Sequence, residues 1–323
     1  MAGPGPGTPV PSLTGALARA LCGGLVMAVA LGAGTTAGPV LADAVGLTGF
    51  AARLVPAVLV SAVAVPLVVL ALRRRGGTPG DIGLGGSTGR LRALLVGVAV
   101  TVGAAGLMLG AATAAGLLRW SRPDLPALTG FLLTNGVVAL LLEALPEETT
   151  LRGYAWTSLR SRLGGPATAL GTTAVFLVVP GASTVVEAGV APLVGAQAGP
   201  VGLAPGGRDP VGYLILLLVF GLMLTVARTA VRHAPLWTAI GAHLAFLTVN
   251  RIVFEGDERG AGWSVALSSP DVELLVPVYL LVATAGFAVW RRVAGRRGDG
   301  GAAVGRVSGV APVRLTRRAA ARR

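Results

Sequence analysis

The sequence of 323 residues contains little charge, because Asp, Glu, Lys and Arg make up only 13% of it while hydrophobic residues make up 53%. Soluble domains carry about 25% charged residues, so this chain cannot cover a water-facing surface of its size. That excludes an ordinary soluble domain, a disordered chain and a coiled coil. A mean hydropathy of +0.75 instead indicates a membrane protein.

Cysteine and histidine are also scarce, and lysine is absent. The single Cys22 excludes a disulfide framework and a metal site built from cysteines, and we expect it to be a small buried apolar residue. The two histidines, His233 and His243, are too few for a three-histidine zinc site. A mixed Glu/His metal site stays open, although no HExxH spacing supports it, so the cofactor requirement is unknown.

Eight apolar stretches of near-membrane length predict an all-α, polytopic membrane helix bundle of about eight transmembrane helices. The fifth and seventh stretches are short and contain polar residues, so we expect them to face protein or a cavity. The stretches are 20–36, 54–72, 93–118, 127–146, 167–179, 211–226, 236–250 and 274–290.

Arginines concentrate in every second loop, namely those after the second, fourth and sixth stretches, and in the C-terminal tail. Arg152 and Arg228 are counted in these loops, and Arg251 in an acidic loop on the other side. The positive-inside rule then places both termini in the cytoplasm of a multi-pass cell-membrane protein. Ten of the 27 arginines follow Trp290, so the net charge of +13 belongs mainly to the tail and does not indicate a nucleic-acid partner.

The chain divides into a cytoplasmic segment (1–19), the transmembrane bundle (20–290) and a basic tail (291–323). We expect the tail to be disordered and to lie on the lipids of the inner leaflet. The first stretch has an alternative interpretation, because an apolar run followed by Ala42-Asp43-Ala44 resembles a cleavable signal peptide. A retained helix is favoured, since the preceding segment is long, nearly uncharged and rich in Pro and Gly.

Three carboxylates lie at the end of the fourth stretch, at Glu143, Glu147 and Glu148, followed by Arg152. Glu147 and Glu148 cannot both be ionised cheaply when partly desolvated, because like charges repel and burial disfavours charge. One of them can then act as a general base near neutral pH. Arg152 lies about one helical turn away and can hold the other one ionised. The alternative is an interfacial ion cluster that caps a helix end.

His243 lies inside the seventh stretch, about 10 Å from its cytoplasmic start at Leu236. That depth allows it to meet Glu143 or Glu147 across the bundle. The alternative is a histidine bonded to a neighbouring carbonyl group. His233 sits in a loop beside Arg232 and is expected to be solvated.

The segment 147–154, Glu-Glu-Thr-Thr-Leu-Arg-Gly-Tyr, resembles the first motif of the CPBP family, which contains the CAAX prenyl endopeptidases of the Ras-converting type. The stretch from Leu236 to His243 resembles its third motif, and the spacing and helix order also agree. The resemblance covers 127–250, the catalytic half of the family.

The resemblance implies intramembrane peptide hydrolysis, in which a glutamate activates water with help from a histidine of an FxxxH motif. A HxxxN pair of the third motif forms the oxyanion hole. Carried over to this chain, Glu147 is the base, Glu148 and Arg152 support it, and His243 stabilises the oxyanion. The family is discussed both as metal-dependent and as metal-free.

The chain departs from this pattern twice. Pro180 stands where the histidine of FxxxH is expected after Phe176, and Leu247 stands where the asparagine of HxxxN is expected. Asn250 lies about 10 Å from His243 along the helix, so it cannot make the same contact. Each loss typically costs two to three orders of magnitude in rate, so the fold resemblance does not by itself imply activity.

Three functions therefore remain open. The first is a CPBP-type endopeptidase, active or diverged, acting on an unidentified peptide or membrane protein. The second is a non-catalytic member of the fold that serves as a scaffold, chaperone or immunity factor. The third is a small transporter that uses Glu147, Glu148 and His243 as a proton path, although the chain lacks two matching membrane halves.

Overall fold

The computed structural model describes residues 12–85, 89–204, 206 and 209–304, with side chains described up to 294. Its helices and strands are, in order, α1 (Leu13–Ala44), α2 (Gly49–Arg73), α3 (Arg90–Ala114), β1 (Leu118–Trp120), α4 (Leu125–Ala139), η1 (Leu140–Ala144), α5 (Leu145–Glu147), η2 (Glu148–Ala155), α6 (Trp156–Arg160), α7 (Gly165–Val190), η3 (Ala191–Leu193), α8 (Pro210–Arg228), α9 (Pro235–Val253), β2 (Val265–Leu267), η5 (Pro270–Leu274) and α10 (Leu275–Val304).

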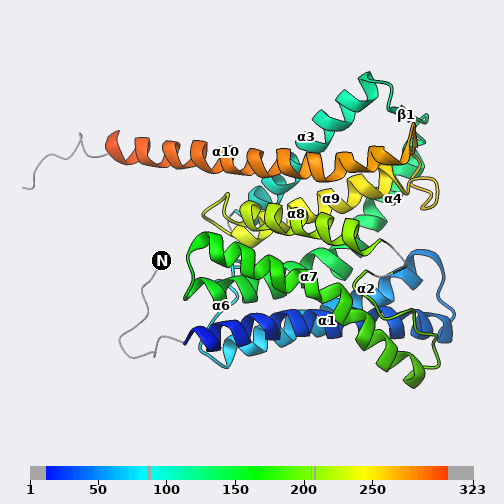
Figure 1. Ribbon diagram of the computed structural model, residues 1–323, viewed down its shortest axis with the longest axis horizontal. Helices are drawn as coiled ribbons and strands as arrows, with labels where there is room; N and C mark the ends of the chain where they lie inside the picture. The colour runs from blue at the N-terminus through cyan, green and yellow to red at the C-terminus, as the bar shows by residue number, and fades with distance from the viewer. Residues whose placement is uncertain (1–11, 86–88, 205, 207–208, 305–323) are drawn as a thin grey trace, which may run out of the picture.

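Helices dominate the fold, and eight of those in the described part of the chain are long and apolar enough to cross a membrane. This confirms the all-α polytopic bundle. The long helices lie side by side, and α1 begins at the same end of the bundle at which α10 finishes (Figure 1). The strands β1 and β2 form a short antiparallel ribbon between loops at the opposite end.

The fourth and fifth spans are longer than the sequence predicted. Helical structure continues through Pro146 as far as Arg160, and through Pro180 as far as Leu193. Proline usually breaks or kinks a helix in water, but membrane helices tolerate it where local π turns and Ser or Thr side chains satisfy the backbone. The hydroxyl groups of Thr150 and Ser183 bond the carbonyl oxygens of Pro146 and Pro180, at 2.8 and 2.7 Å.

Three arginines that were assigned to loops lie inside helices. Arg152 belongs to η2, Arg228 to the last turn of α8 and Arg251 to the last turn of α9. The fourth span had been predicted to end at Pro146, whereas its helical structure continues to Arg160, so Arg152 lies inside it. The carboxylates that precede it are likewise internal to a long helical element and do not mark its end.

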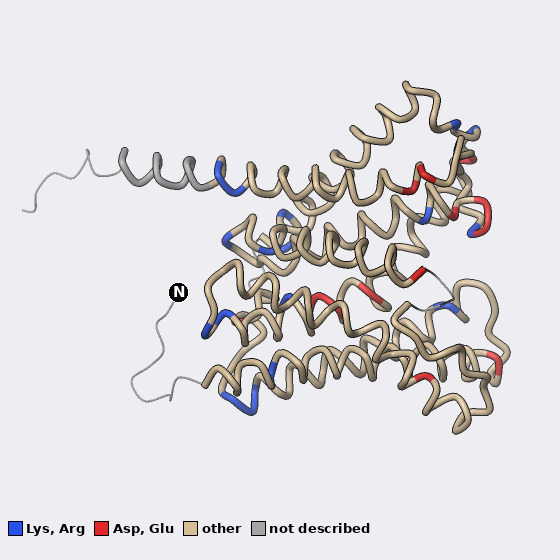
Figure 2. Tube along the Cα trace, viewed as in Figure 1, with Lys and Arg blue, Asp and Glu red and all other residues tan. Residues whose placement is uncertain are grey.

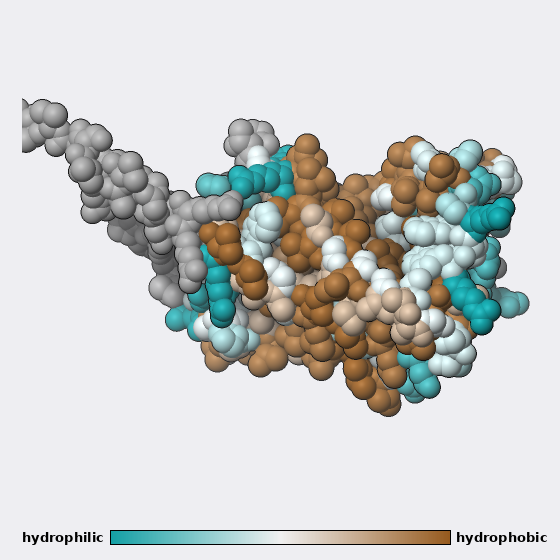
Figure 3. All heavy atoms as spheres, turned by 90° about the horizontal axis from the view of Figure 1, so that it is seen from above, coloured by the Kyte–Doolittle hydropathy of each residue, from teal (hydrophilic) through white to brown (hydrophobic). Residues whose placement is uncertain are grey.

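Charge is nevertheless segregated along the bundle. Most arginines gather at one end and most acidic residues, with fewer arginines, at the other (Figure 2). Apolar side chains cover the middle of the face seen in Figure 3, with hydrophilic ones toward its ends. Cys22 on α1 is exposed, which corrects the expectation of burial. An apolar exterior is favourable where the solvent is lipid, so a small apolar residue has no need of the core.

Close helix crossings fix the positions of α1 and α9. A Cβ atom on Gly97 of α3 would lie 2.1 Å from the carbonyl oxygen of Thr238, and one on Gly241 of α9 equally close to that of Leu94. Small residues allow membrane helices to approach in this way. On the other side, Gly23 of α1 faces the carbonyl oxygen of Thr150 in η2. Removal of α1 as a signal peptide would expose this face of η2.

At both ends the helices continue beyond the predicted bundle of 20–290. Helix α1 starts at Leu13, where the hydroxyl oxygen of Ser12 accepts a hydrogen bond from the backbone of Gly15 at 3.1 Å. Helix α10 continues past Trp290 to Val304, within the segment for which a disordered tail was expected. Arginine and alanine are good helix formers, and adding residues to an existing helix is easier than starting one. Residues 1–11 and 305–323 lie outside the described part.

Candidate functional site

The predicted carboxylates lie on a helix that is repeatedly interrupted by π turns. The segment η1 ends just before α5, and η2 begins at Glu148, so Glu147 stands between two π-helical stretches. Single π turns inside α-helices are rare and often occur at functional sites. Here they change the register of the helix and point Glu143 and Glu148 toward different neighbours.

Glu148, Arg152 and His243 form a buried cluster, which we call the inner cluster. Nη1 of Arg152 donates to Oε1 of Glu148 at 3.3 Å, and Nδ1 of His243 lies 3.0 Å from the same oxygen. The side chains of Glu148 and Arg152 are 0% exposed and that of His243 is 2% exposed. The structure thus brings together three of the four predicted site residues, across η2 and α9.

Aromatic rings enclose the inner cluster. The ring of Phe176 on α7 lies 4.4 Å from the guanidinium carbon of Arg152. The ring of Phe220 on α8 meets the imidazole of His243 edge-on at 4.9 Å, and it also stacks on Phe246. A cation over an aromatic face is stabilised further when it is desolvated. These rings keep the charged cluster separate from lipid on the sides of α7 and α8.

The inner cluster retains unused hydrogen-bonding capacity. Oε2 of Glu148 and both Nε and Nη2 of Arg152 are buried without a partner in the described part of the chain. Buried polar atoms of native proteins are nearly always bonded to protein or water. The cluster therefore has one acceptor and two donor groups available for a polar guest such as water or a peptide backbone.

Glu147, the fourth predicted residue, is half-buried beside this cluster. Its carboxylate makes no hydrogen bond or ion pair with another described residue, yet it is close enough to His243 and Arg152 to interact electrostatically with both. Of the two adjacent glutamates, Glu148 is therefore the one held by Arg152, and Glu147 is the one left free to accept a proton.

A second cluster, the outer cluster, involves Glu143, Asn135 and Arg251. Arg251 pairs with Glu143 of η1 through Nη2 and donates from Nη1 to Oδ1 of Asn135 at 3.1 Å. Glu143 had been expected to point to the same region as Glu147. The π turn and the pairing with Arg251 direct it instead toward the last turn of α9.

Arg228 is a further buried cation near the inner cluster. It interacts electrostatically with Glu148, and its Nη2 donates to the hydroxyl of Thr157 at 3.3 Å. Its guanidinium carbon lies 5.7 Å from the ring centre of Trp156. Arg228 thus adds positive charge on the η2–α6 side of Glu148, beyond what Arg152 supplies.

The two departures from the family pattern are visible in the structure. Asn250 bonds the hydroxyl of Tyr279 at 2.7 Å and the carbonyl oxygen of Phe246, so it does not replace the missing asparagine at Leu247. Pro180 is buried on α7, four residues after Phe176. Residues four apart share a helix face, so Pro180 lies on the face of α7 that covers Arg152.

A polar cavity opening to the cytoplasm had been expected at this site. A described cavity lies elsewhere, at the arginine-rich end between α3, the α8–α9 loop and α10, and none of the four predicted site residues lines it. Within the described residues, no three His, Cys, Asp or Glu side chains gather as metal ligands.

Sequence reasoning missed the partners of the predicted residues more than the residues themselves. Asn135 is a buried amide inside an apolar span, and a polar side chain at that depth was an available signal. Phe176 was visible as the first residue of the FxxxH pattern. Arg228 and Arg251 were hidden by their assignment to loops, and the π turns leave no mark in hydrophobic periodicity.

Comparison with family models gives one finding, which covers this site. Residues 129–249 match the family described as type II CAAX prenyl endopeptidase, Rce1-like. The match confirms the CPBP resemblance, and its limits agree with the predicted core of 127–250. The segment holds the four predicted site residues and the whole inner cluster, and of the outer cluster it holds Asn135 and Glu143 but not Arg251. Comparisons with curated proteins and with solved structures gave no match.

Proposed function

We propose that this CAAX-protease-like membrane protein is an intramembrane endopeptidase in which Glu147 activates the attacking water. One observation carries the proposal: Glu147 has no bonded partner among the described residues while the adjacent Glu148 is bound by Arg152 and His243. A general base must be free to accept a proton. The family match at 129–249 supports peptide hydrolysis as the reaction class.

In the proposed reaction, the carboxylate of Glu147 takes a proton from water as the water oxygen attacks the scissile carbonyl carbon. The resulting tetrahedral oxyanion accepts a hydrogen bond from Nε2–H of His243, whose other nitrogen is held by Glu148. The proton on Glu147 then passes to the amide nitrogen as the C–N bond breaks. Glu147 returns to its starting state, and the products are a carboxylic acid and an amine.

Glu148 and Arg152 act as positioning residues in this scheme. The bond between Nδ1 of His243 and Glu148 fixes the orientation of the imidazole, and the proposed role requires a proton on both ring nitrogens. Arg152 in turn balances the negative charge of Glu148, with which it forms an ion pair. A carboxylate that orients an imidazole is a recurring arrangement in hydrolases, and here it is built from one π-helical turn and α9.

The test is cleavage of a peptide library by the full-length protein in proteoliposomes, with products identified by mass spectrometry. Glu147→Gln should lower the rate by about 10²- to 10⁴-fold, because the amide cannot accept the proton. Glu258→Gln is the matched control, since Glu258 is an exposed loop residue. Equal rates for wild type and Glu147→Gln would refute the role of Glu147.

A non-catalytic CPBP-fold protein is the second candidate, favoured by Pro180 and Leu247 at the two motif positions. Pro180→His separates the candidates, because Pro180 shares a helix face with Phe176, whose ring covers Arg152. A rise in cleavage would indicate a protease whose activity has declined. If neither form cleaves, and Glu147→Ala still impairs the cell, the scaffold function is supported.

We also propose that both termini face the cytoplasm. The arginine-rich end of the bundle, where α1 begins and α10 finishes, is then the inner side (Figures 1 and 2). Reporter fusions after Gly80 and after Gly206 should report inside and outside, respectively. The opposite pair of results would place the inner cluster in the reverse orientation and contradict this proposal.

A further inference from the structure

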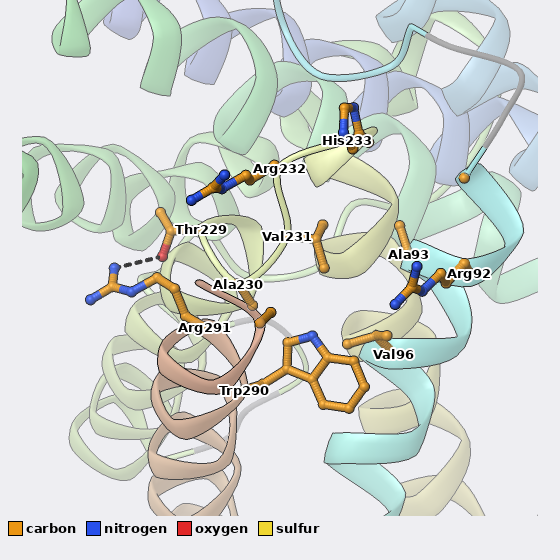
Figure 4. A pocket seen from close by; sticks show the side chains of 12 residues that line it. Arg92, Ala93, Val96, Thr229, Ala230, Val231, Arg232, His233, Trp290 and Arg291 are labelled. Carbon is orange, nitrogen blue, oxygen red and sulfur yellow. Dashed lines mark hydrogen bonds between the residues drawn. The ribbon is translucent and has the colours of Figure 1, made fainter. Parts of the chain in front are cut away.

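A cavity of about 760 Å³ lies at the arginine-rich end of the bundle. Its walls come from three elements: the first turns of α3, the loop between α8 and α9, and the last described turns of α10. It does not include any residue of the inner or outer cluster, and the proposed peptide hydrolysis makes no use of it. Figure 4 shows it from close by.

The described charged residues around this cavity are arginines. Arg92 of α3 lies on one side, and Arg232 of the loop and Arg291 of α10 lie on the other (Figure 4). No acidic side chain is among the described residues that line the cavity. Arg291 donates to the hydroxyl of Thr229 at 3.4 Å, whereas Arg92 and Arg232 form no ion pair with the described residues. The arrangement is complementary to an anion held between opposite walls.

The interior of the cavity is mainly apolar. Val96, Val231 and the indole of Trp290 lie between the arginines (Figure 4). Next to it on α3, Leu91 and Leu95 are 69% and 53% exposed, and they lead along the outer surface of the bundle. Tryptophan is enriched where protein crosses the boundary between lipid and water. The cavity thus joins a cationic rim to a surface that faces acyl chains.

We propose that this cavity binds one anionic phospholipid. Its phosphodiester lies between Arg92 and the Arg232–Arg291 side, and one acyl chain passes over Trp290 and Val96 toward the exposed leucines of α3. A simpler ligand would contact only the arginines or only the apolar interior. Free phosphate does not contact the apolar interior, and a neutral lipid does not pair with three arginines. Positive charge at a membrane surface attracts anionic lipid generally, but here it converges on a cavity.

The test uses the full-length protein in mild detergent, titrated with dioleoylphosphatidylglycerol or dioleoylphosphatidylcholine and followed by native mass spectrometry. Phosphatidylglycerol should bind more tightly than phosphatidylcholine. Each arginine removed should weaken phosphatidylglycerol binding by about fivefold, so Arg92→Gln with Arg232→Gln should weaken it by about 25-fold. Phosphatidylcholine binding should change little.

The matched control removes two arginines from the opposite end, Arg119 and Arg122, both exposed. Arg119→Gln with Arg122→Gln should leave phosphatidylglycerol binding within about twofold of wild type, because exposed charges more than a Debye length away are screened. An equal loss in both double variants would show that only overall charge matters. Equal affinity of wild type for the two lipids would also overturn the proposal.

A second variant tests the apolar half without changing charge. Ala294→Trp places a bulky ring in the lining and should lower phosphatidylglycerol binding at least tenfold. Inorganic phosphate and an acidic peptide serve as competitors. If Ala294→Trp has no effect and inorganic phosphate displaces the lipid, the cavity is an anion site only. If the acidic peptide displaces the lipid from wild type at equal concentration, it is a peptide site. Either result contradicts a phospholipid site.

Discussion

Two carboxylate–arginine clusters lie along the same interrupted helix, and they differ in how completely they are bonded. In the outer cluster, Glu143 and Arg251 are 21% and 12% exposed, and Asn135 provides a third partner. In the inner cluster, Glu148 and Arg152 are fully buried, yet both retain unpartnered atoms. The more deeply buried pair is the less saturated one.

We interpret this difference as separating the carboxylates that hold the helix in place from those of the proposed reactive site. In the outer cluster both charges are paired, and the pair connects η1 to the last turn of α9; the one buried atom there without a partner among the described residues is the neutral Nδ2 of Asn135. The inner cluster is open and contains the imidazole of His243 and the adjacent free carboxylate of Glu147. Polar atoms that are fully buried without a hydrogen-bond partner cost free energy. Proteins retain such atoms mainly at functional sites.

The strongest test of the comparison is Glu148→Leu. It leaves Arg152 as a buried cation without its carboxylate, which should lower the free energy of unfolding by about 3–5 kcal/mol. Thermal unfolding of the detergent-solubilised protein, followed by tryptophan fluorescence, measures the change. If Glu148→Leu lowers the free energy of unfolding by less than Glu143→Leu in the outer cluster does, the inner ion pair is not the one that contributes more to stability.

The double variant Glu148→Leu with Arg152→Leu is the control for that interpretation. Replacing both partners of a buried ion pair by apolar residues is often nearly neutral, so most of the lost stability should return. Proposed peptide cleavage should stay absent, because His243 has lost its orienting partner. Failure of stability to return would place the cost in packing with Phe176 and not in the unpaired charge.

His243 should show an intermediate effect. His243→Leu removes the bond to Glu148 and should cost about 1.5–3 kcal/mol, the range for hydrogen bonds to charged groups. His243→Asn keeps a donor near the position of Nδ1 and should recover part of that loss. The same unfolding assay compares the two, and the cleavage assay should find both inactive, since neither presents Nε2. Activity in His243→Asn would argue against the oxyanion role.

The part of the site that could be predicted from sequence rests on depth and spacing. His243 lies seven residues after Leu236, the predicted start of its span, and the helical rise of about 1.5 Å per residue placed it level with the glutamates. Arg152 follows the two glutamates by four or five residues, and this spacing predicted that it pairs with one of them. These relations depend on one helix at a time, so the sequence contains them.

The rest depends on features that no local pattern records. The π turns at 140–144 and 148–155 shift Glu143 away from Glu147, and hydrophobic periodicity does not distinguish a π turn from an α turn. The predicted spans ended at Pro146 and Val179, whereas lipid favours continued helix through Pro146 and Pro180. Cys22 was expected to be buried as a small apolar residue, but it is exposed, and an apolar residue can face lipid.

The smallest expected effect is that of Glu143→Gln in the outer cluster. Glutamine keeps an acceptor for Arg251, and Asn135 still bonds its Nη1, so the arginine is not left alone. Because both side chains are partly exposed, the lost ion pair should cost about 1 kcal/mol or less. The rate of proposed cleavage should stay within about threefold of wild type, since Glu147 is untouched.

Unfolding and cleavage of Glu143→Gln are measured on the same preparation, so that a loss of activity can be compared with a loss of stability. A loss of cleavage as large as that of Glu147→Gln, without a matching loss of stability, would mean that Glu143 takes part in the reaction. The two clusters would then be one site divided by a π turn.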